Sequence, residues 1–474
     1  MPVPGEYFEA RERALLGTRY DVLYTAPCAV RRGVTVNGLR CAPQEFAAAV
    51  DFGLEPSPFC DAAFLLTDPQ LRPGRHAYHH AGVFYVQEPS ASVPAGLLGV
   101  RPGERVLDLC AAPGGKTSQL AAALRGEGLL VANEYVAARV GVLKSNLERM
   151  GVTNALVLNE STARVAAAFP AFFDKILVDA PCSGEGMFRK EPEALRQHSA
   201  ALGASILDDA AAALRPGGLL CYSTCTFAPE EDEAQVGAFL ARHPEFTVLP
   251  APTNAGAPGE AARCGAHPFA AEHTRRIYPC HGGEGHFMAL LQKRGDGAPP
   301  EAEQARPRAA RGQRGAKRGR DMRACRPAQG GNGVSRAEAR AEGEAFLREY
   351  FPGAAQLPLE CRGTELFVLS REGCGPAEGL RVVQAGVCAG SAARGRFVPA
   401  HHLFMAYGAQ CANAERLTLA DPRTAAWLRG EAIPAETAAP GWAAVLADGF
   451  PLGFGKQSGG VVKNHYPKGL RNLK

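Results

Sequence analysis

Short apolar runs that alternate with alanine- and leucine-rich segments most constrain the fold of this chain. Between about residues 76 and 293, the runs RVLDLC, LLVANE, ALVLN, KILVDA and GLLCYST are rich in valine, isoleucine and leucine. Such runs are typical of parallel strands that are buried on both faces and joined by helices. We therefore expect a doubly wound α/β sheet that binds its ligand at the carboxyl ends of the strands. The later segment GHFMALLQK suits an added edge strand.

Length and shifts in composition predict several domains. The chain has 474 residues, which is more than one ordinary core accommodates. Residues 1–75 mix helical and extended patterns, as in a small α/β domain, and the alternating pattern fills residues 76–293. Residues 294–335 are basic and lack apolar periodicity, which predicts a flexible linker. Residues 336–474 contain strand-like runs with glycine turns, which predicts a C-terminal, mainly β module.

Composition also narrows the class of protein. No apolar run is long enough to cross a bilayer, and the first residues have no secretory signal pattern, so we expect a cytoplasmic protein. The 14 cysteines include no CxxC pair, which predicts free thiols and no metal. Any functional cysteine must therefore be identified from its surroundings.

A glycine turn follows the first strand of the alternating region. The segment VLDLCAAPGGKT leads from this strand into a helix, and its adjacent glycines let the backbone approach a ligand. The helix start offers unpaired N–H groups to polar atoms. The turn matches neither GxGxxG nor the phosphate loop, and a plain tight turn is the alternative interpretation.

Acidic residues at the next two strand ends are candidate ligands for a cofactor. Glu134 follows the second strand, about twenty residues after the glycine turn, where folds of this kind hold ribose hydroxyls. Arg139 is placed to orient Glu134, or is a surface residue. Glu160 follows the third strand and could accept from an adenine amine, or be ordinary loop polarity.

Two cysteines and an aspartate end the fourth and fifth strands. Asp179 and Cys182 lie in ILVDAPCSGEG, and Cys225 lies in GLLCYSTCT. In a doubly wound sheet these ends converge on one pocket. A thiolate adding to carbon 6 of a cytosine would activate carbon 5 for methylation, and a carboxyl group would hold the ring. Either cysteine could be the nucleophile on chemistry alone, and packed thiols are the alternative interpretation.

These motifs resemble the NOL1/NOP2/Sun family of RNA cytosine-5 methyltransferases. DLCAAPGGKT, DAPCSGEG, YSTCT followed by PEEDE, and FYVQEPSA carry the resemblance, which covers residues 76–293. It implies a class I, Rossmann-like methyltransferase fold that uses S-adenosylmethionine. It also implies that Cys225 is the nucleophile and that Cys182 assists product release. The cofactor contacts that it implies are Cys110, Ala111, Ala112, Pro113, Gly114, Gly115, Lys116, Glu134, Glu160 and Asp179. The family usually has aspartate in place of Glu160.

The last residues resemble the C-terminal RNA-binding module of bacterial ribosomal-RNA members of this family. Cations would contact phosphates there, and an aromatic ring could stack on a base. The predicted RNA contacts are Lys463, His465, Tyr466, Lys468 and Arg471. The resemblance also makes the N-terminal domain a candidate RNA-binding domain. An exposed basic tail that binds nothing is the alternative interpretation.

Ribosomal RNA, free or in the small ribosomal subunit, is the expected partner. A transfer-RNA cytosine-5 methyltransferase would use the same chemistry, and the C-terminal module favours ribosomal RNA only by analogy. A noncatalytic RNA-binding factor for ribosome assembly is a further alternative, against which the intact motifs argue. A dehydrogenase is a poor alternative, because the chain lacks GxGxxG.

Overall fold

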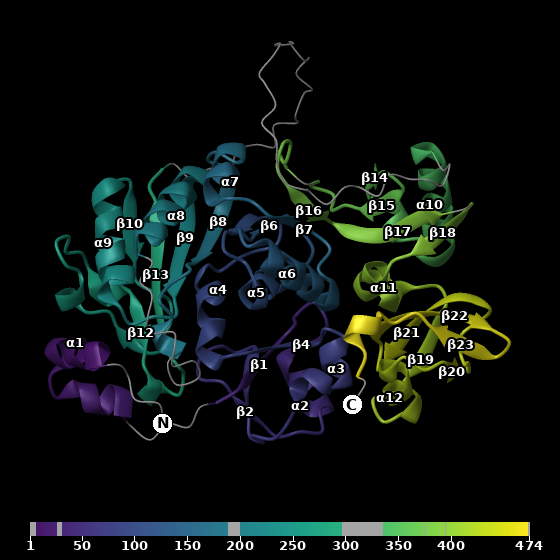
Figure 1. Ribbon diagram of the computed structural model, residues 1–474, viewed down its shortest axis with the longest axis horizontal. Helices are drawn as coiled ribbons and strands as arrows, with labels where there is room; N and C mark the ends of the chain where they lie inside the picture. The colour runs from purple at the N-terminus through teal and green to yellow at the C-terminus, as the bar shows by residue number, and fades with distance from the viewer. Residues whose placement is uncertain are drawn as a thin grey trace, which may run out of the picture.

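A large mixed sheet lies at the centre of the fold (Figure 1). The computed structural model describes residues 6–25, 31–187, 200–295, 335–373, 375–393 and 395–472. Within these residues the chain forms four sheets. The strands of the central sheet run in the order β11 (Ala257–Pro258), β12 (Arg275–Ile277), β13 (His286–Lys293), β9 (Leu214–Thr224), β8 (Phe173–Asp179), β5 (Arg105–Asp108), β6 (Leu129–Asn133), β7 (Ala155–Leu158) and β16 (Val382–Ala385), with β10 (Phe246–Leu249) also paired to β13.

Five parallel strands, β9, β8, β5, β6 and β7, confirm the predicted α/β architecture. Helices cover both faces of this part of the sheet, and each face has its own apolar core. One core contains residues of α4 (Val93–Leu97), α5 (Gly115–Leu124) and α6 (Ala137–Met150). The other contains residues of α7 (Thr162–Ala168), α8 (Ala200–Ala213) and α9 (Glu233–Arg242). Burial on two faces explains why the strands read as continuous apolar runs.

The strand β13 is not an edge strand, so that prediction is wrong. One side of β13 pairs antiparallel with β9, and the other side is shared by β12 and β10. The chain between β9 and β13 supplies these extra strands and covers the edge. The opposite edge is formed by β16, which comes from the C-terminal part of the chain and pairs antiparallel with β7.

The N-terminal part of the chain forms a small antiparallel sheet with a separate helix, α1 (Glu6–Leu16). The sheet order is β2 (Leu54–Pro56), β3 (Ala63–Leu66), β1 (Gly33–Val36) and β4 (Phe84–Gln87), so this sheet extends past residue 75. The helices α2 (Pro43–Ala49) and α3 (Ala77–His80) belong to the same region.

Helix α1 is held against the central domain by buried charges. Glu12 and Arg263 are both fully buried and pair through 2.6 Å between Glu12 Oε2 and Arg263 Nη2. The hydroxyl of Tyr24 and Nε of Arg11 also donate to Glu12. Buried ion pairs need such additional partners, because both charges have lost water. The arrangement fixes α1 beside residues that are far away in the sequence.

The C-terminal part forms two sheets rather than one. The first has the order β14 (Leu359–Arg362), β15 (Glu365–Val368), β17 (Val387–Ala393) and β18 (Arg396–Pro399), and α10 (Arg336–Tyr350) packs on it. The second has the order β19 (Ala414–Leu417), β21 (Gly441–Ala447), β22 (Phe450–Ser458), β23 (Val461–Asn464) and β20 (Ile433–Pro434), with α11 (His401–Tyr407) and α12 (Pro422–Arg429). The predicted mainly β character is confirmed.

The second C-terminal sheet shares a core with the N-terminal domain. Val34, Phe46 and Phe84 of the N-terminal domain belong to the same apolar cluster as Trp427 and Val445. Figure 1 shows the C-terminus beside α3. The sheet of the N-terminal domain and the second C-terminal sheet therefore form one folded unit.

The sequence also makes predictions about a linker, membrane spans and metal sites. The predicted linker at 294–335 falls almost entirely outside the described residues. Within the described part of the chain, no helix has the length and apolarity needed to span a membrane. The same residues contain no cluster of three or more histidine, cysteine or acidic side chains that could hold a metal ion.

Candidate active site

The glycine turn connects β5 to α5 at the carboxyl end of the sheet. Gly114 has φ +110°, in the left-handed region that favours glycine. A Cβ atom at Gly115 would lie 2.6 Å from Oε1 of Gln87, so glycine lets α5 begin directly against the N-terminal sheet. Thr117 Oγ1 donates to Asp108 Oδ2 over 2.7 Å, and burial raises the pKa of Asp108 to about 7.

Glu134 and Arg139 lie beside this turn, as predicted for a cofactor site. Glu134 Oε1 accepts from the backbone N–H of Val136 at 2.8 Å, and Oε2 lies 3.3 Å from Nη1 of Arg139. Arg139 also donates from Nη2 to the carbonyl oxygen of Ala112 over 2.6 Å. Arg139 thus joins the acidic residue to the glycine turn and holds both in place.

A cavity of about 590 Å³ opens between these elements. This volume lies in the range of sites that bind drug-sized molecules. Its lining combines the Glu134 carboxylate with apolar side chains and three thiols, those of Cys110, Cys182 and Cys225. The lining residues are Leu109, Cys110, Ala112, Asn133, Glu134, Tyr135, Val136, Arg139, Ser161, Thr162, Asp179, Ala180, Pro181, Cys182, Leu202, Ile206 and Cys225.

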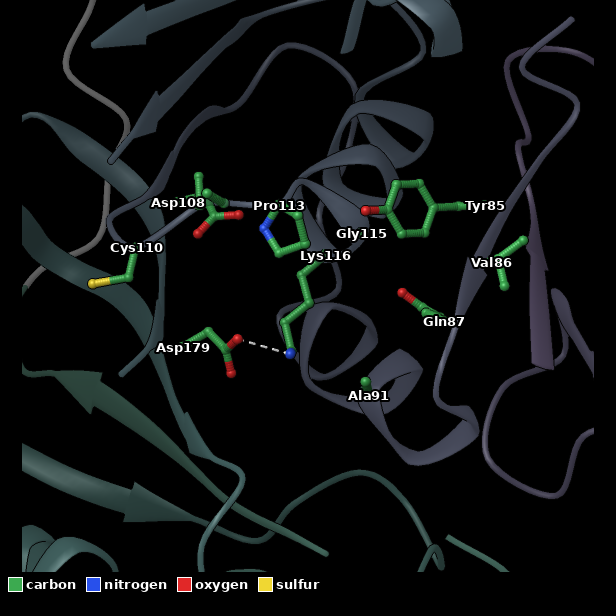
Figure 2. A pocket seen from close by; sticks show the side chains of 12 residues that line it. Tyr85, Val86, Gln87, Ala91, Asp108, Cys110, Pro113, Gly115, Lys116 and Asp179 are labelled. Atoms are coloured by element: carbon green, nitrogen blue, oxygen red, sulfur yellow. Dashed lines mark hydrogen bonds and ion pairs between the residues drawn. The ribbon is translucent and has the colours of Figure 1, made fainter. Parts of the chain in front are cut away.

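Lys116 and Asp179 form an ion pair in a second, smaller cavity. Figure 2 shows the Lys116 ammonium pointing at Asp179, with Tyr85 and Gln87 of the N-terminal region opposite. Lys116 Nζ donates to Asp179 Oδ2 over 2.8 Å, and Ser223 Oγ donates to Oδ1 over 2.8 Å. Burial alone would raise the pKa of Asp179, but the Lys116 charge, the nearby His286 and the hydrogen bonds from Lys116 and Ser223 together leave the pKa below its usual value. Asp179 lines both cavities and is ionised at neutral pH.

Cys182 and Cys225 meet at the wall of the larger cavity. Their sulfur atoms are 3.5 Å apart, within the range of a thiol hydrogen bond. A hydrogen bond from Cys182 lowers the pKa of Cys225, and the Lys116 charge acts in the same direction. The same bond and burial raise the pKa of Cys182. Cys225 is therefore the thiolate of the pair, and Cys182 stays a neutral thiol that donates a hydrogen bond to it.

Two sets of hydrogen bonds hold the loop that carries Cys182. Glu231, in the PEEDE segment, accepts from the Ser183 N–H at 3.1 Å and from its hydroxyl at 2.5 Å. Ser183 Oγ also lies 2.7 Å from Oγ1 of Thr226, the residue after Cys225. On the other side of the loop, Arg11 of α1 pairs with the buried Glu185 through 2.6 Å between Nη2 and Oε2. These bonds fix the relative position of the two thiols.

The carboxylate of Glu160 contacts two other parts of the protein. Its Oε1 accepts from the backbone N–H of Arg381 at 2.7 Å, and its Oε2 lies 3.0 Å from Nε of Arg164. Glu160 is also absent from the residues that line the larger cavity, whereas the adjacent Ser161 and Thr162 line it. A strand from the C-terminal part of the chain occupies the carboxylate, so the prediction that Glu160 accepts from adenine is not supported.

The predicted RNA contacts near the C-terminus divide into two groups. Lys463, His465 and Lys468 are exposed, so they remain candidates for phosphate contacts. Tyr466 is only 2% exposed, and its hydroxyl lies 2.7 Å from Nδ1 of His80. The prediction that Tyr466 stacks on a base is therefore wrong. Arg471 donates to the carbonyl oxygen of Tyr466 at 3.2 Å, which indicates a structural role.

The sequence reasoning missed several residues of the site. Tyr135 and Val136, which are exposed by 72% and 46%, line the larger cavity. Their position directly after Glu134 could have identified them. His286 follows a glycine at the start of β13, and the β9–β13 register places it opposite Cys225. Burial and the nearby Lys116 lower the pKa of His286 to about 4, so it is neutral at pH 7.

Known structures share this fold. A methyltransferase homologue from Pyrococcus horikoshii is 28% identical and aligns with TM-score 0.52, covering 60% of this chain and 99% of that structure. The structure of NSun6 from Pyrococcus horikoshii with SFG is 20% identical, with TM-score 0.52, covering 62% of this chain and all of that structure. The fold, the glycine turn and the acidic residue after the second strand define a class I methyltransferase, whose cofactor is S-adenosylmethionine.

Family comparisons identify the branch of this class. Models described as the N-terminal domain of 16S rRNA methyltransferase RsmF, 16S rRNA methyltransferase RsmB/F, the RsmF first C-terminal domain and the RsmF PUA domain match residues 4–89, 95–292, 345–407 and 414–472. The chain belongs to the RsmB/F family of methyltransferases, which confirms the predicted family.

Curated relatives carry one name. The ribosomal RNA small subunit methyltransferase F of Serratia proteamaculans is 38% identical over 279 residues, covering 56% of this chain and 57% of that protein. The protein of the same name from Klebsiella pneumoniae is 37% identical over 308 residues, covering 61% and 63%. The chain thus spans about three fifths of the length of the curated relatives that it matches.

Proposed function

We propose that this protein transfers a methyl group from S-adenosylmethionine to carbon 5 of a cytosine in ribosomal RNA, using Cys225 as nucleophile. One observation carries the chemistry. Two thiols 3.5 Å apart share a cavity with the ionised Asp179 and with the glycine turn. A simple methyl transfer to an oxygen or nitrogen atom needs neither thiol. A pyrimidine carbon needs a nucleophile to activate it, and it needs a second group to complete the release.

The larger cavity is the proposed cofactor site. Glu134 offers carboxylate lone pairs to a ribose diol, while Tyr135 and Val136 offer apolar surface to an adenine ring. When bound there, S-adenosylmethionine supplies an electrophilic methyl group on a sulfonium centre. Arg139 and the Val136 N–H hold Glu134 in a single orientation, so little ordering is needed on binding.

The thiolate of Cys225 starts the reaction. Its sulfur forms a bond to carbon 6 of the cytosine, and the displaced π electrons make carbon 5 nucleophilic. Carbon 5 then takes the methyl group. A base then takes the carbon 5 proton, for which the ionised Asp179 carboxylate in the same cavity is the candidate. The C–H electron pair returns to the ring, the sulfur–carbon bond breaks and Cys225 leaves as a thiolate. The Cys182 thiol, 3.5 Å from the Cys225 sulfur, donates a hydrogen bond to the departing thiolate and so favours release.

The ion pair of Lys116 and Asp179 is the proposed holder of the ring. The Asp179 carboxylate can accept from the exocyclic amine, which distinguishes cytosine from uracil. The Lys116 ammonium, whose pKa is raised by Asp179 despite burial, can donate to an acceptor of the ring and stabilise charge that develops on it. The pair therefore supports both recognition of the base and its activation. The base must leave its stack to reach this depth.

Ribosomal RNA is the proposed substrate because the curated relatives carry that name and because the chain matches their PUA domain model. Exposed Lys463 and Lys468 on the C-terminal sheet region support contacts with phosphates. Transfer RNA would require the same site, so only the identity of the methylated RNA separates these substrates.

Labelled S-adenosylmethionine and purified small-subunit ribosomal RNA provide the test. We expect wild-type protein to incorporate label as 5-methylcytosine, identified by mass spectrometry of nucleosides. Cys225→Ala should bind cofactor and incorporate no label, whereas Cys182→Ala should accumulate a covalent protein–RNA adduct. Full activity of Cys225→Ala would refute the assigned nucleophile. Incorporation only into transfer RNA would refute the substrate, and cofactor binding without incorporation into either RNA would favour a noncatalytic assembly factor.

A further inference from the structure

A C-terminal segment, residues 379–386, forms the outer wall of the central sheet next to the proposed cofactor site. Its strand β16 pairs with β7 over Val382–Leu158 and Ala385–Leu156, and Gly386 donates to the carbonyl of Ala155 over 2.9 Å. Figure 1 shows β16 beside β7, away from the C-terminal sheet that contains β17. Gly386, with φ +59°, is the single residue between β16 and β17. One strand of the central sheet is thus covalently continuous with the C-terminal sheet.

Two residues at the end of β7 clamp this segment. The carboxylate of Glu160 accepts from the backbone N–H of Arg381 over 2.7 Å. The side-chain oxygen of Asn159 accepts from Nη1 of Arg381 over 3.0 Å. The N–H of Asn159 donates back to the carbonyl of Arg381 over 3.1 Å. Arg164, which pairs with Glu160, donates to the carbonyl of Gly379 over 2.5 Å. Glu160 is 6% exposed, so these donors replace the water that its carboxylate oxygens have lost.

The clamp continues into the proposed cofactor cavity. The side-chain amide of Asn159 donates to the carbonyl oxygens of Glu134 and Tyr135 over 2.8 and 2.9 Å. Glu134 and Tyr135 both line the cavity. Asn159 therefore binds Arg381 with its oxygen and the cofactor loop with its nitrogen. A side-chain amide that is hydrogen-bonded through both its oxygen and its nitrogen has one orientation. Loss of the partner at one atom therefore frees the partner at the other atom.

We propose that docking of segment 379–386 and binding of S-adenosylmethionine stabilise each other through Asn159, with Arg381 as a positioning residue. This inference rests on the proposed placement of the cofactor at Glu134. Cofactor binding requires the loop at 134–136 in its bound position, and Arg381 restrains that loop through one intervening side chain. Coupling between two binding events is reciprocal, so the cofactor must tighten the segment as much as the segment tightens the cofactor.

Substitution of Arg381 in the full chain tests the first direction of the coupling. Arg381→Ala removes the donor to Asn159, and we expect the Kd for S-adenosylmethionine, measured by calorimetry without RNA, to rise about tenfold. Arg381→Lys keeps a cationic donor and should restore most of the affinity. Arg396→Ala removes an exposed arginine from β18 of the neighbouring sheet and is the matched control, with unchanged affinity expected. At saturating cofactor, Arg381→Ala should keep a near-normal kcat, so that the loss appears in KM for the cofactor. An unchanged Kd in Arg381→Ala would overturn the proposal.

Hydrogen–deuterium exchange tests the reciprocal direction. Cofactor should slow exchange of the amides at 382–386 in the wild-type protein, although these residues do not line the cavity. Arg381→Ala at saturating cofactor should lose this protection while keeping it at 134–136. Protection confined to 134–136 in the wild type would refute the coupling but not the function. Failure of the wild-type protein to bind S-adenosylmethionine at all would instead refute the proposed cofactor site and, with it, this inference.

Discussion

Removal of the Cys182 thiol should make Cys225 a weaker acid. The two sulfur atoms are 3.5 Å apart, and the hydrogen bond from Cys182 lowers the pKa of Cys225. A hydrogen bond to a charged group contributes about 1.5–3 kcal/mol. At about 1.4 kcal/mol for each pKa unit, Cys182→Ala should raise the pKa of Cys225 by roughly 1–2 units. The thiolate fraction near neutral pH should fall by about tenfold to a hundredfold.

Alkylation by iodoacetamide, followed by mass spectrometry of the peptide that contains Cys225, measures this pKa from the pH dependence of the rate. The wild-type protein and Cys182→Ala are compared without RNA. Cys182→Ser is the matched control, because its hydroxyl also donates and should keep much of the effect. In Cys225→Ala, the pKa of Cys182 should fall, because the group that raises it is gone. An unchanged or lower pKa of Cys225 in Cys182→Ala would show that the two thiols have the opposite roles.

Three further predictions concern the cofactor, the buried charges and the histidines. Glu134→Gln should raise the Kd for S-adenosylmethionine, measured by calorimetry, about tenfold to a hundredfold. Glu127→Gln, at the opposite end of β6, should leave the Kd unchanged. Equal affinities of Glu134→Gln and the wild-type protein would exclude Glu134 as a ligand. Arg263→Met should lower the free energy of unfolding by about 3–5 kcal/mol in chemical denaturation. The same substitution at the surface residue Arg242 should lower it by less than about 1 kcal/mol. Equal losses in the two variants would contradict the buried pair. Burial lowers the pKa of four interface histidines to about 3 or 4, below the unfolded value, so the unfolded chain binds more protons below pH 6.5. The free energy of unfolding should then fall with falling pH, by about 1.4 kcal/mol per pH unit for each histidine, until the folded pKa values are reached. Thermal unfolding measured from pH 7 to pH 5 checks this. A melting temperature that does not change over this range would contradict the burial of His79, His80, His401 and His402.

The parallel strands and the glycine turn could be predicted because their signals are local. Strands buried on both faces must be continuously apolar, and a turn that packs against another sheet must be glycine. The pairing of Lys116 with Asp179 could not be predicted, because the partners are 63 residues apart and neither position has a periodic signal. The contact of Glu160 with Arg381 could not be predicted for a similar reason, since the two residues are 221 positions apart.

The C-terminal contacts show a different limit of sequence reasoning. Basic neighbours suggested that Tyr466 was exposed, but its ring packs against His401 and its hydroxyl lies against His80, 386 residues away. Strand β16 lies in the C-terminal region where the sequence predicts strand-like runs, yet its membership of the central sheet depends on tertiary contacts with β7. Propensity describes what a segment forms, whereas its neighbours are decided by the whole chain.

The buried pair of Glu12 and Arg263 has a consequence for how the protein is made. Its members are 251 residues apart, so helix α1 leaves the ribosome long before its partner is synthesised. Until then the carboxylate of Glu12 lacks its partner Arg263, and Arg11 lacks its partner Glu185. The nascent chain therefore completes the support of its reactive loop late in synthesis, and refolding should be slow because these contacts close long loops.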